Sequence, residues 1–204
     1  MVKRKAKTKA FRVSVVVPHV PYTRIKELAR LREALQRQTV QSFELLIIEK
    51  KQSAFKSNNE GWRKAKGDIV WFIADDMVPE PDALEKALQV FRDKDPDGVE
   101  GHIYGLVERI YDWGFMSGHI FYKRKVLQQY GGFDERFKGW RGDTDFAWTV
   151  LDGGGKIIYC PESKAMHPGR PTTVPNMEAE RLLQKKHPER YELAKQGNHL
   201  HCYL

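Results

Sequence analysis

Residues 69–76 have the sequence IVWFIADD, an apolar run that ends abruptly in two carboxylates, Asp75 and Asp76. A short run rich in β-branched and aromatic residues is typical of a strand buried on both faces of a parallel sheet. Adjacent carboxylates at the end of such a strand repel each other and lose hydration, and a bound divalent cation would relieve both costs. The alternative is a capping turn before Pro79, with Asp76 in solvent.

Strand and helix patterns alternate on the amino-terminal side of this run. The predicted elements are buried strands at 11–17 and 43–48, a helix capped by Thr23, and a helix over 59–66 that stops at Gly67. Basic residues, Arg24 among them, occupy the outer face of the first helix. This order implies parallel strands whose ligands bind beyond their carboxyl ends. The segments at those ends are 19–22, 49–52 and 74–77.

The patterns on the carboxyl-terminal side are shorter and more interrupted. They predict a helix starting at Pro81 and Asp82, a turn at 95–98, β structure over 99–121 and a helix at 123–130. A loop at 131–145 is followed by a helix at 144–151 and a strand at 156–160. A linker at 168–175 then leads to a helix over 178–195 that is interrupted near Pro188. Together the two sides predict an α/β protein.

The composition is that of an ordinary globular enzyme. A length of 204 residues fits one domain. Two cysteines, Cys160 and Cys202, exclude a disulfide framework and a four-cysteine zinc site. No apolar run approaches the roughly 18 residues of a membrane span, and residues 1–10 have no apolar signal core. We therefore expect a cytoplasmic enzyme without a transmembrane segment.

Five positive charges lie within the first ten residues. The net charge of +8, which is 35 basic minus 27 acidic residues, falls to +3 without these five, Lys3, Arg4, Lys5, Lys7 and Lys9. A solvated flexible arm explains this cluster, and so does an arm that binds a polyanion such as nucleic acid or a lipid surface. Composition does not choose between them.

Two further residues are candidates for chemistry. Asp143 precedes a predicted helix, where it would act as an N-cap or as a general base at the mouth of the same cleft. His167 follows the strand at 156–160 and would be a further metal ligand or a structural histidine.

Several motifs then occur in a fixed order along the chain. They are VSVVVP at 13–18, LREALQRQT at 31–39, FELLII at 43–48, Asn59-Glu60-Gly61 with Ala65 and Gly67-Asp68, Asp75-Asp76, GGFDERF at 131–137, and DTDF at 143–146. In this order, from about Phe11 to His167, the chain resembles the family-2 nucleotide-sugar glycosyltransferases of the GT-A fold.

The resemblance implies an α/β chain with the GT-A fold, in which a Rossmann-like mixed sheet carries helices on both faces within a single compact domain. The chain would divide into a basic flexible arm (1–10), a nucleotide-sugar-binding half (11–98), an acceptor and catalytic half (99–167), and a linker with a C-terminal helix and tail (168–204).

The resemblance also implies inverting transfer of a sugar from a nucleoside diphosphate sugar, with a UDP-sugar favoured, to a hydroxyl of an acceptor glycan or another compound. Mn2+ or Mg2+ on Asp76 and His167 would stabilise the departing diphosphate, and Asp143 would take the acceptor's proton. The expected donor-binding residues are Pro18, His19, Val20, Tyr22, Glu49, Asn59, Asp75 and Asp76. The expected acceptor or sugar contacts are Trp140, Gly142 and Asp145, with Arg141 and Arg170 near the diphosphate.

Three positions depart from the family pattern. Glu49 stands where an aspartate usually contacts the base, and Ala74 stands at the first aspartate of the Asp-x-Asp motif. Gly142 replaces the acid that usually precedes the catalytic aspartate. These departures bear on the donor's identity and on metal binding.

Other functions remain open at this point. A sugar-nucleotide nucleotidyltransferase shares the early strand–helix pattern, but it needs a glycine-rich loop after the first strand, and residues 18–24 contain no glycine. A non-catalytic nucleotide-sugar-binding module would bind the donor without turnover. A nucleic-acid acceptor would use the basic arm.

Two groups of residues in the second half of the chain fit more than one ligand. Aromatic residues there suit sugar rings or bases, and they are Tyr104, Tyr111, Trp113, Phe115 and Trp140. The final segment, with His199, His201 and Cys202, would bind a metal or form a frayed tail.

Overall fold

The apolar run forms the central strand β3 (Ile69–Ile73), and all of its side chains are buried in the computed structural model of the chain. The structure describes residues 11–49, 53–105, 118–168 and 176–196. β3 pairs in parallel with β1 (Val13–His19) and antiparallel with β6 (His119–Lys123). A strand with neighbours on both edges and helices on both faces is shielded from water, which explains its composition.

The strands of the described residues form one mixed sheet in the order β2-β1-β3-β6-β5-β7-β4. β2 (Phe43–Glu49) is parallel to β1, whereas β5 (Gly98–Gly105) is antiparallel to β6 and parallel to β7 (Ile157–His167). The short strand β4 (Val78–Pro79) pairs with β7 at the edge. Because β3 and β5 both run opposite to β6, the carboxyl ends of five strands lie at one edge of the sheet.

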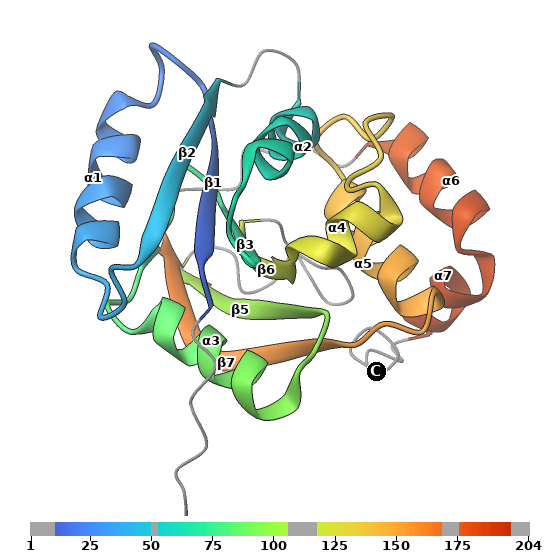
Figure 1. Cartoon of the computed structure of the whole chain (residues 1–204). Helices are drawn as coiled ribbons and strands as arrows, with labels where there is room; N and C mark the ends of the chain where they lie inside the picture. The colour runs from blue at the N-terminus through green and yellow to red at the C-terminus, as the bar shows by residue number, and fades with distance from the viewer. Residues whose placement is uncertain (1–10, 50–52, 106–117, 169–175, 197–204) are drawn as a thin grey trace, which may run out of the picture.

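Helices cover both faces of this sheet (Figure 1). α1 (Ile25–Gln36) and α3 (Ala83–Lys94) pack on the face that carries Trp71 and Ile73. The other face, which carries Phe72, is covered by α2 (Ala54–Lys64), α4 (Arg124–Tyr130), α5 (Gly142–Asp152), α6 (Met177–Lys186) and α7 (Pro188–Lys195). The predicted Rossmann-like mixed sheet with helices on both faces is confirmed.

Some element boundaries differ from the predicted ones. Arg24, not Thr23, is the N-cap of α1, and the Thr23 hydroxyl instead lies 3.5 Å from the Val20 carbonyl. α2 begins five residues earlier than predicted, because the Ser53 hydroxyl accepts a hydrogen bond of 3.2 Å from the Lys56 amide and caps the helix. β7 extends beyond Cys160 to His167 across an irregularity in its pairing with β5.

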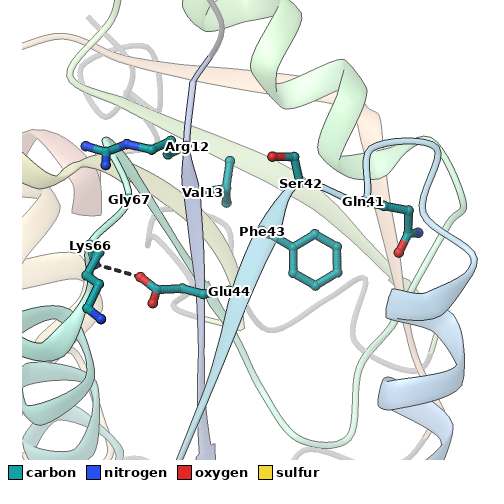
Figure 2. A pocket seen from close by; sticks show the side chains of 8 residues that line it. All are labelled: Arg12, Val13, Gln41, Ser42, Phe43, Glu44, Lys66 and Gly67. Atoms are coloured by element: carbon teal, nitrogen blue, oxygen red, sulfur yellow. Dashed lines mark hydrogen bonds between the residues drawn. The ribbon is translucent and has the colours of Figure 1, made fainter.

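A pocket of about 290 Å³ lies at the amino ends of β1 and β2, the edge opposite to the predicted ligand site (Figure 2). Glu44 at this pocket accepts hydrogen bonds from the Ser14 hydroxyl (2.5 Å) and the Lys66 amide (2.6 Å). The Ser14 hydroxyl in turn accepts from the Gly67 amide at 2.8 Å. A Cβ on Gly67 would come within 2.6 Å of the Ser14 nitrogen, so close packing explains this motif glycine.

A buried histidine links the centre of the sheet to β7. The Trp71 indole donates to Nδ1 of His119 at 3.0 Å, and Nε2 of His119 lies 3.1 Å from the Ser163 carbonyl. A neutral imidazole protonated at Nε2 satisfies both contacts. Burial lowers the pKa of His119 to about 4.

This histidine makes the fold sensitive to acid. The folded protein keeps His119 neutral while the unfolded chain protonates it below its ordinary pKa of 6.5, so stability is complete above that pH. Between pH 6.5 and about 4 we expect the free energy of unfolding to fall by about 3 kcal/mol from this group. Urea unfolding across this range measures the loss.

The His119→Gln variant is the matched comparison, and its unfolding free energy should change less with pH over the same interval. A carbon chemical-shift titration of the imidazole gives an independent reading. Protonation of His119 in the folded protein near pH 6.5 would contradict the expectation.

Candidate active site

Asp75, at the carboxyl end of β3, holds the loop between β1 and α1. It is 3% exposed, and its Oδ2 accepts hydrogen bonds from Nδ1 of His19 (3.0 Å) and from the Val20 amide (3.3 Å). Its Oδ1 accepts from Nη1 of Arg24 at 3.0 Å. Both oxygens are therefore hydrogen-bonded inside the protein, and this gives Asp75 a scaffolding role. Its predicted contact with the donor stays a prediction.

Asp76 lies beside His167, the other residue that the sequence analysis proposes as a metal ligand. His167 ends β7, and its Nε2 is 3.7 Å from Oδ2 of Asp76. The same carboxylate oxygen accepts a short hydrogen bond from Nη1 of Arg24. Strands distant in sequence thus bring Asp76, His167 and Arg24 together at the carboxyl edge of the sheet.

The Asp76–His167 pair fits a divalent cation that has further ligands of its own. Two atoms 3.7 Å apart can share an ion at bond lengths of about 2.1 Å, and a carboxylate oxygen with an imidazole nitrogen suits Mn2+. Within the described ranges, no group of three or more His, Cys, Asp or Glu residues is placed to hold a metal. The other ligands would be waters and substrate phosphates, as is common for such ions.

Arg24 is the site residue that sequence reasoning missed. Its helical spacing places it on the outer face of α1, but as the N-cap it precedes the first helical turn and faces the ligand edge. Burial lowers the pKa of Arg24, and the charges of Asp76 and Asp75 outweigh that effect and raise it. Its position directly after a loop that follows a strand was the one available signal.

The predicted donor-binding loop presents an exposed aromatic ring at this edge. Tyr22 is 91% exposed and has a φ of 70°. This left-handed conformation costs an L residue roughly 1–2 kcal/mol. Glu49, also exposed, lies opposite His19 in the pairing of β1 with β2, and Pro18 lies opposite Ile48. Strain at an exposed ring is typical of a residue kept for binding.

Asp143 lies in the first turn of α5 and is half-buried. Asp143 is thus inside the helix, whereas the sequence analysis predicted that it lies just before the helix begins. Its Oδ1 accepts from the Thr144 amide at 3.0 Å, and a carboxylate here is stabilised by the helix dipole. Burial and then the charges of Glu100 and Asp143 raise the pKa of the Tyr122 hydroxyl well above its ordinary value.

Gly142 is explained by packing. A Cβ at this position would lie 2.5 Å from the Phe55 ring, so α5 approaches α2 too closely for a side chain. The acid expected here from the family pattern therefore has no room in this chain.

Trp140, predicted to contact the sugar, and Arg141, predicted to lie near the diphosphate, are held by the C-terminal helices. Trp140 is 7% exposed, and its indole donates to Oε1 of Glu180 at 2.6 Å. Arg141 donates to the same oxygen at 2.7 Å and lies over the Trp140 ring. Burial and these contacts give Trp140 and Arg141 a structural role, and their predicted contacts with the sugar and the diphosphate stay predictions.

Asp145 is also buried, at 2% exposure, and is neutralised by α6 and the residue that follows it. Its Oδ1 lies 2.7 Å from Nζ of Lys186 and 3.0 Å from Nε2 of His187. Lys186 also reaches Asp134 at 2.9 Å, and His187 also reaches Asp152 at 2.7 Å. Asp145 therefore anchors α5 to the C-terminal helices, and its role as a sugar contact stays a prediction.

Asn59, predicted to bind the donor, is buried and fully used by the chain. Its Nδ2 donates to the Phe133 carbonyl (2.7 Å) and to Glu135 (2.9 Å), and its Oδ1 accepts from the Phe133 amide (2.9 Å) and the Trp62 indole (3.0 Å). Asn59 thus ties α2 to the segment before Asp143, and its contact with the donor stays a prediction.

A groove of about 900 Å³ lies beside β7, lined in part by His102, Tyr104, Tyr159, Glu80 and Lys164. The His102 and Tyr104 rings stack at 6.3 Å, and Nδ1 of His102 lies 2.6 Å from the Tyr159 hydroxyl. Of the two described members of the predicted aromatic surface, Tyr104 and Trp140, Tyr104 lines this groove. Aromatic rings interspersed with charged groups suit a hydroxyl-rich ligand.

Several predicted residues lie outside the described residues. They are the basic arm at 1–10, the segment 50–52, Tyr111, Trp113, Phe115, Arg170, His199, His201 and Cys202. Their proposed roles stay predictions. Across the described residues no helix is both long and apolar enough to cross a membrane.

Comparison with known proteins agrees with this architecture. The sequence model of the family described as "Glycosyl transferase family 2" matches residues 31–150. An uncharacterized glycosyltransferase of Haemophilus influenzae is 33% identical over a match that covers 38% of this chain and 34% of that protein. The chain thus spans about a third of the length of this curated relative.

Two solved structures share the fold. The mannosyltransferase PcManGT of Pyrobaculum calidifontis, in complex with GDP-Man and Mn2+, has a TM-score of 0.65 and 18% identity, covering 93% of this chain and 65% of that one. Residues 1–349 of TarS of S. aureus, in complex with UDP-GlcNAc, have a TM-score of 0.71 and 15% identity, covering 87% and 67%. At these identities the likeness concerns the fold.

The contacts of Asp145 lead to a stability test. We expect Asp145→Asn to lower the free energy of unfolding by about 3 kcal/mol, because the change weakens two buried charged contacts. Asp143→Asn, two residues earlier and half-buried, should cost less than about 1 kcal/mol. Urea denaturation of both variants and the wild type measures the difference, and equal losses would contradict the assignment.

Proposed function

Since the chain belongs to glycosyl transferase family 2, we propose that it transfers a sugar from a nucleoside diphosphate sugar to an acceptor hydroxyl, with inversion at the anomeric carbon. The pairing of Asp76 with His167 at the carboxyl edge of the sheet is the observation that carries this proposal. The structural relatives bind GDP-Man with Mn2+ and UDP-GlcNAc, which supports a nucleotide-sugar donor.

Asp76 and His167 would hold Mn2+ or Mg2+, and the bound ion would stabilise the negative charge that develops on the leaving diphosphate. Asp75 contributes by keeping the loop after β1 in place around this pair. The exposed Tyr22 ring and Glu49 at the same edge would contact the nucleoside, with uridine as the favoured base.

Asp143 is the proposed general base. As the acceptor oxygen attacks the anomeric carbon, its proton passes to the Asp143 carboxylate, and the bond from that carbon to the diphosphate oxygen breaks. Attack from the face opposite the leaving group gives inversion. The contacts of Trp140 and Arg141 with Glu180 fix the loop that precedes Asp143 and so orient it.

The proposed acceptor is a glycan or another compound with a free hydroxyl. The groove beside β7, with its stacked His102 and Tyr104 rings, supports a saccharide acceptor.

Replacing Asp143 should separate catalysis from donor binding. We expect Asp143→Asn to reduce sugar transfer by 10²- to 10⁴-fold, because the amide cannot accept the proton. Release of nucleoside diphosphate measures turnover. Asp93→Asn, an exposed carboxylate on α3, is the control and should keep full activity. Wild-type turnover by Asp143→Asn would remove Asp143 as the base.

Donor and metal are tested by thermal unfolding with UDP- and GDP-sugars, each with and without Mn2+. A ligand at 100 times its Kd stabilises by about 2.7 kcal/mol, which raises Tm by roughly 5–10 °C for a domain of this size. We expect this rise only when Mn2+ is present, and we expect Asp76→Ala to lose it.

A wild-type protein that binds a donor but never turns it over, across a broad acceptor screen, would favour the non-catalytic module. No shift with any donor would contradict the proposed function.

A further inference from the structure

One guanidinium already occupies the carboxylates at which a metal is proposed to bind. Nη1 of Arg24 donates to Oδ1 of Asp75 at 3.0 Å and to Oδ2 of Asp76. The Arg24 side chain is 25% exposed, whereas that of Asp75 is 4% exposed. A single cationic nitrogen thus bridges two adjacent carboxylates that would otherwise repel each other.

The oxygen that Arg24 contacts is the one a metal ion would need. Nε2 of His167 lies 3.7 Å from Oδ2 of Asp76, so this is the carboxylate oxygen placed to share an ion with His167. Arg24 already donates to the same oxygen, and cations placed together on it would repel each other. Arg24 and a divalent ion therefore compete for Asp76.

A displaced Arg24 would remain near the site. Its backbone is fixed as the N-cap of α1, and its contact with Asp75 does not involve the metal-binding oxygen. Phosphate oxygens are the acceptors that a guanidinium fork matches best, and a nucleoside diphosphate would bring them to this edge together with the ion.

We propose that Arg24 is an internal cation that keeps a free divalent ion off the Asp76–His167 pair and turns to the phosphate oxygens when the ion enters with a nucleoside diphosphate. The inference rests on the proposed function and deepens it, because it assigns Arg24 to the diphosphate. This role of Arg24 makes the binding of the metal ion and of the nucleotide interdependent. By linkage, the ion raises the affinity for the nucleotide by the same factor by which the nucleotide raises the affinity for the ion.

Mn2+ binding alone tests this without any turnover. Electron paramagnetic resonance of unbound Mn2+ gives its Kd for the wild type and for Arg24→Met, with no nucleotide, with UDP and with GDP. Arg24→Met should bind Mn2+ alone about tenfold or more tightly than the wild type. The factor by which nucleotide tightens Mn2+ binding should fall about tenfold or more.

Two further variants make the result specific. Arg30→Met removes a charge from the exposed face of the same helix, where Arg30 pairs with Glu27 at 3.4 Å, and should match the wild type. Arg24→Lys keeps the charge but loses the fork, so it should reduce the nucleotide effect by a smaller factor. Far-UV circular dichroism confirms folding, and Arg24→Lys carries the test if Arg24→Met does not fold.

The outcomes separate the inference from the proposed function. If the folded Arg24 variants bind Mn2+ as the wild type does, with the same nucleotide effect, Arg24 has no such role and the proposed function stands. If none of the proteins binds Mn2+ with or without UDP or GDP, the metal-dependent function is overturned, and this inference with it.

Discussion

A buried carboxylate organises the edge of the sheet on which the proposed chemistry depends. Asp75 accepts hydrogen bonds from the His19 ring, the Val20 amide and the Arg24 guanidinium, so three points of one loop are fixed to the end of β3. Isolated in the interior, this charge would cost several kcal/mol. Its three donors offset that cost and place the loop beside Asp76. The hydrogen bonds that hold this loop to the sheet are therefore the same ones that shape the candidate site.

Much of the fold was predictable because local patterns determine it. The apolar residues of β3 alternate between the core on the α1 side and the core on the α2 side, as a strand covered on both faces requires. The start of α2 was missed because the polar cap Ser53 defines it and periodicity does not. Periodicity also predicted that Arg24 lies on the outer face of α1. That prediction does not apply to an N-cap residue, because the cap precedes the helical repeat.

The candidate site was predictable where chain order decides it. Strand ends meet at one edge in a parallel arrangement, so Asp76 and His167 could be expected to meet. The burial of Trp140, Asp145 and Asn59 could not be predicted, because residue type alone does not distinguish a ligand-facing polar group from a buried one. Their partners lie about 40 to 75 positions away, on Glu180, Lys186 and Phe133, and only the folded chain reveals those contacts.

The contact between Gly142 and Phe55 links one departure from the family pattern to a residue in a distant part of the chain. A Cβ on Gly142 would overlap the Phe55 ring at 2.5 Å, so a larger residue there requires the ring to move or a smaller residue at position 55. We therefore expect substitutions at positions 55 and 142 to be correlated among homologues of this chain. Restoring the acid by engineering is therefore best attempted together with a smaller residue at position 55.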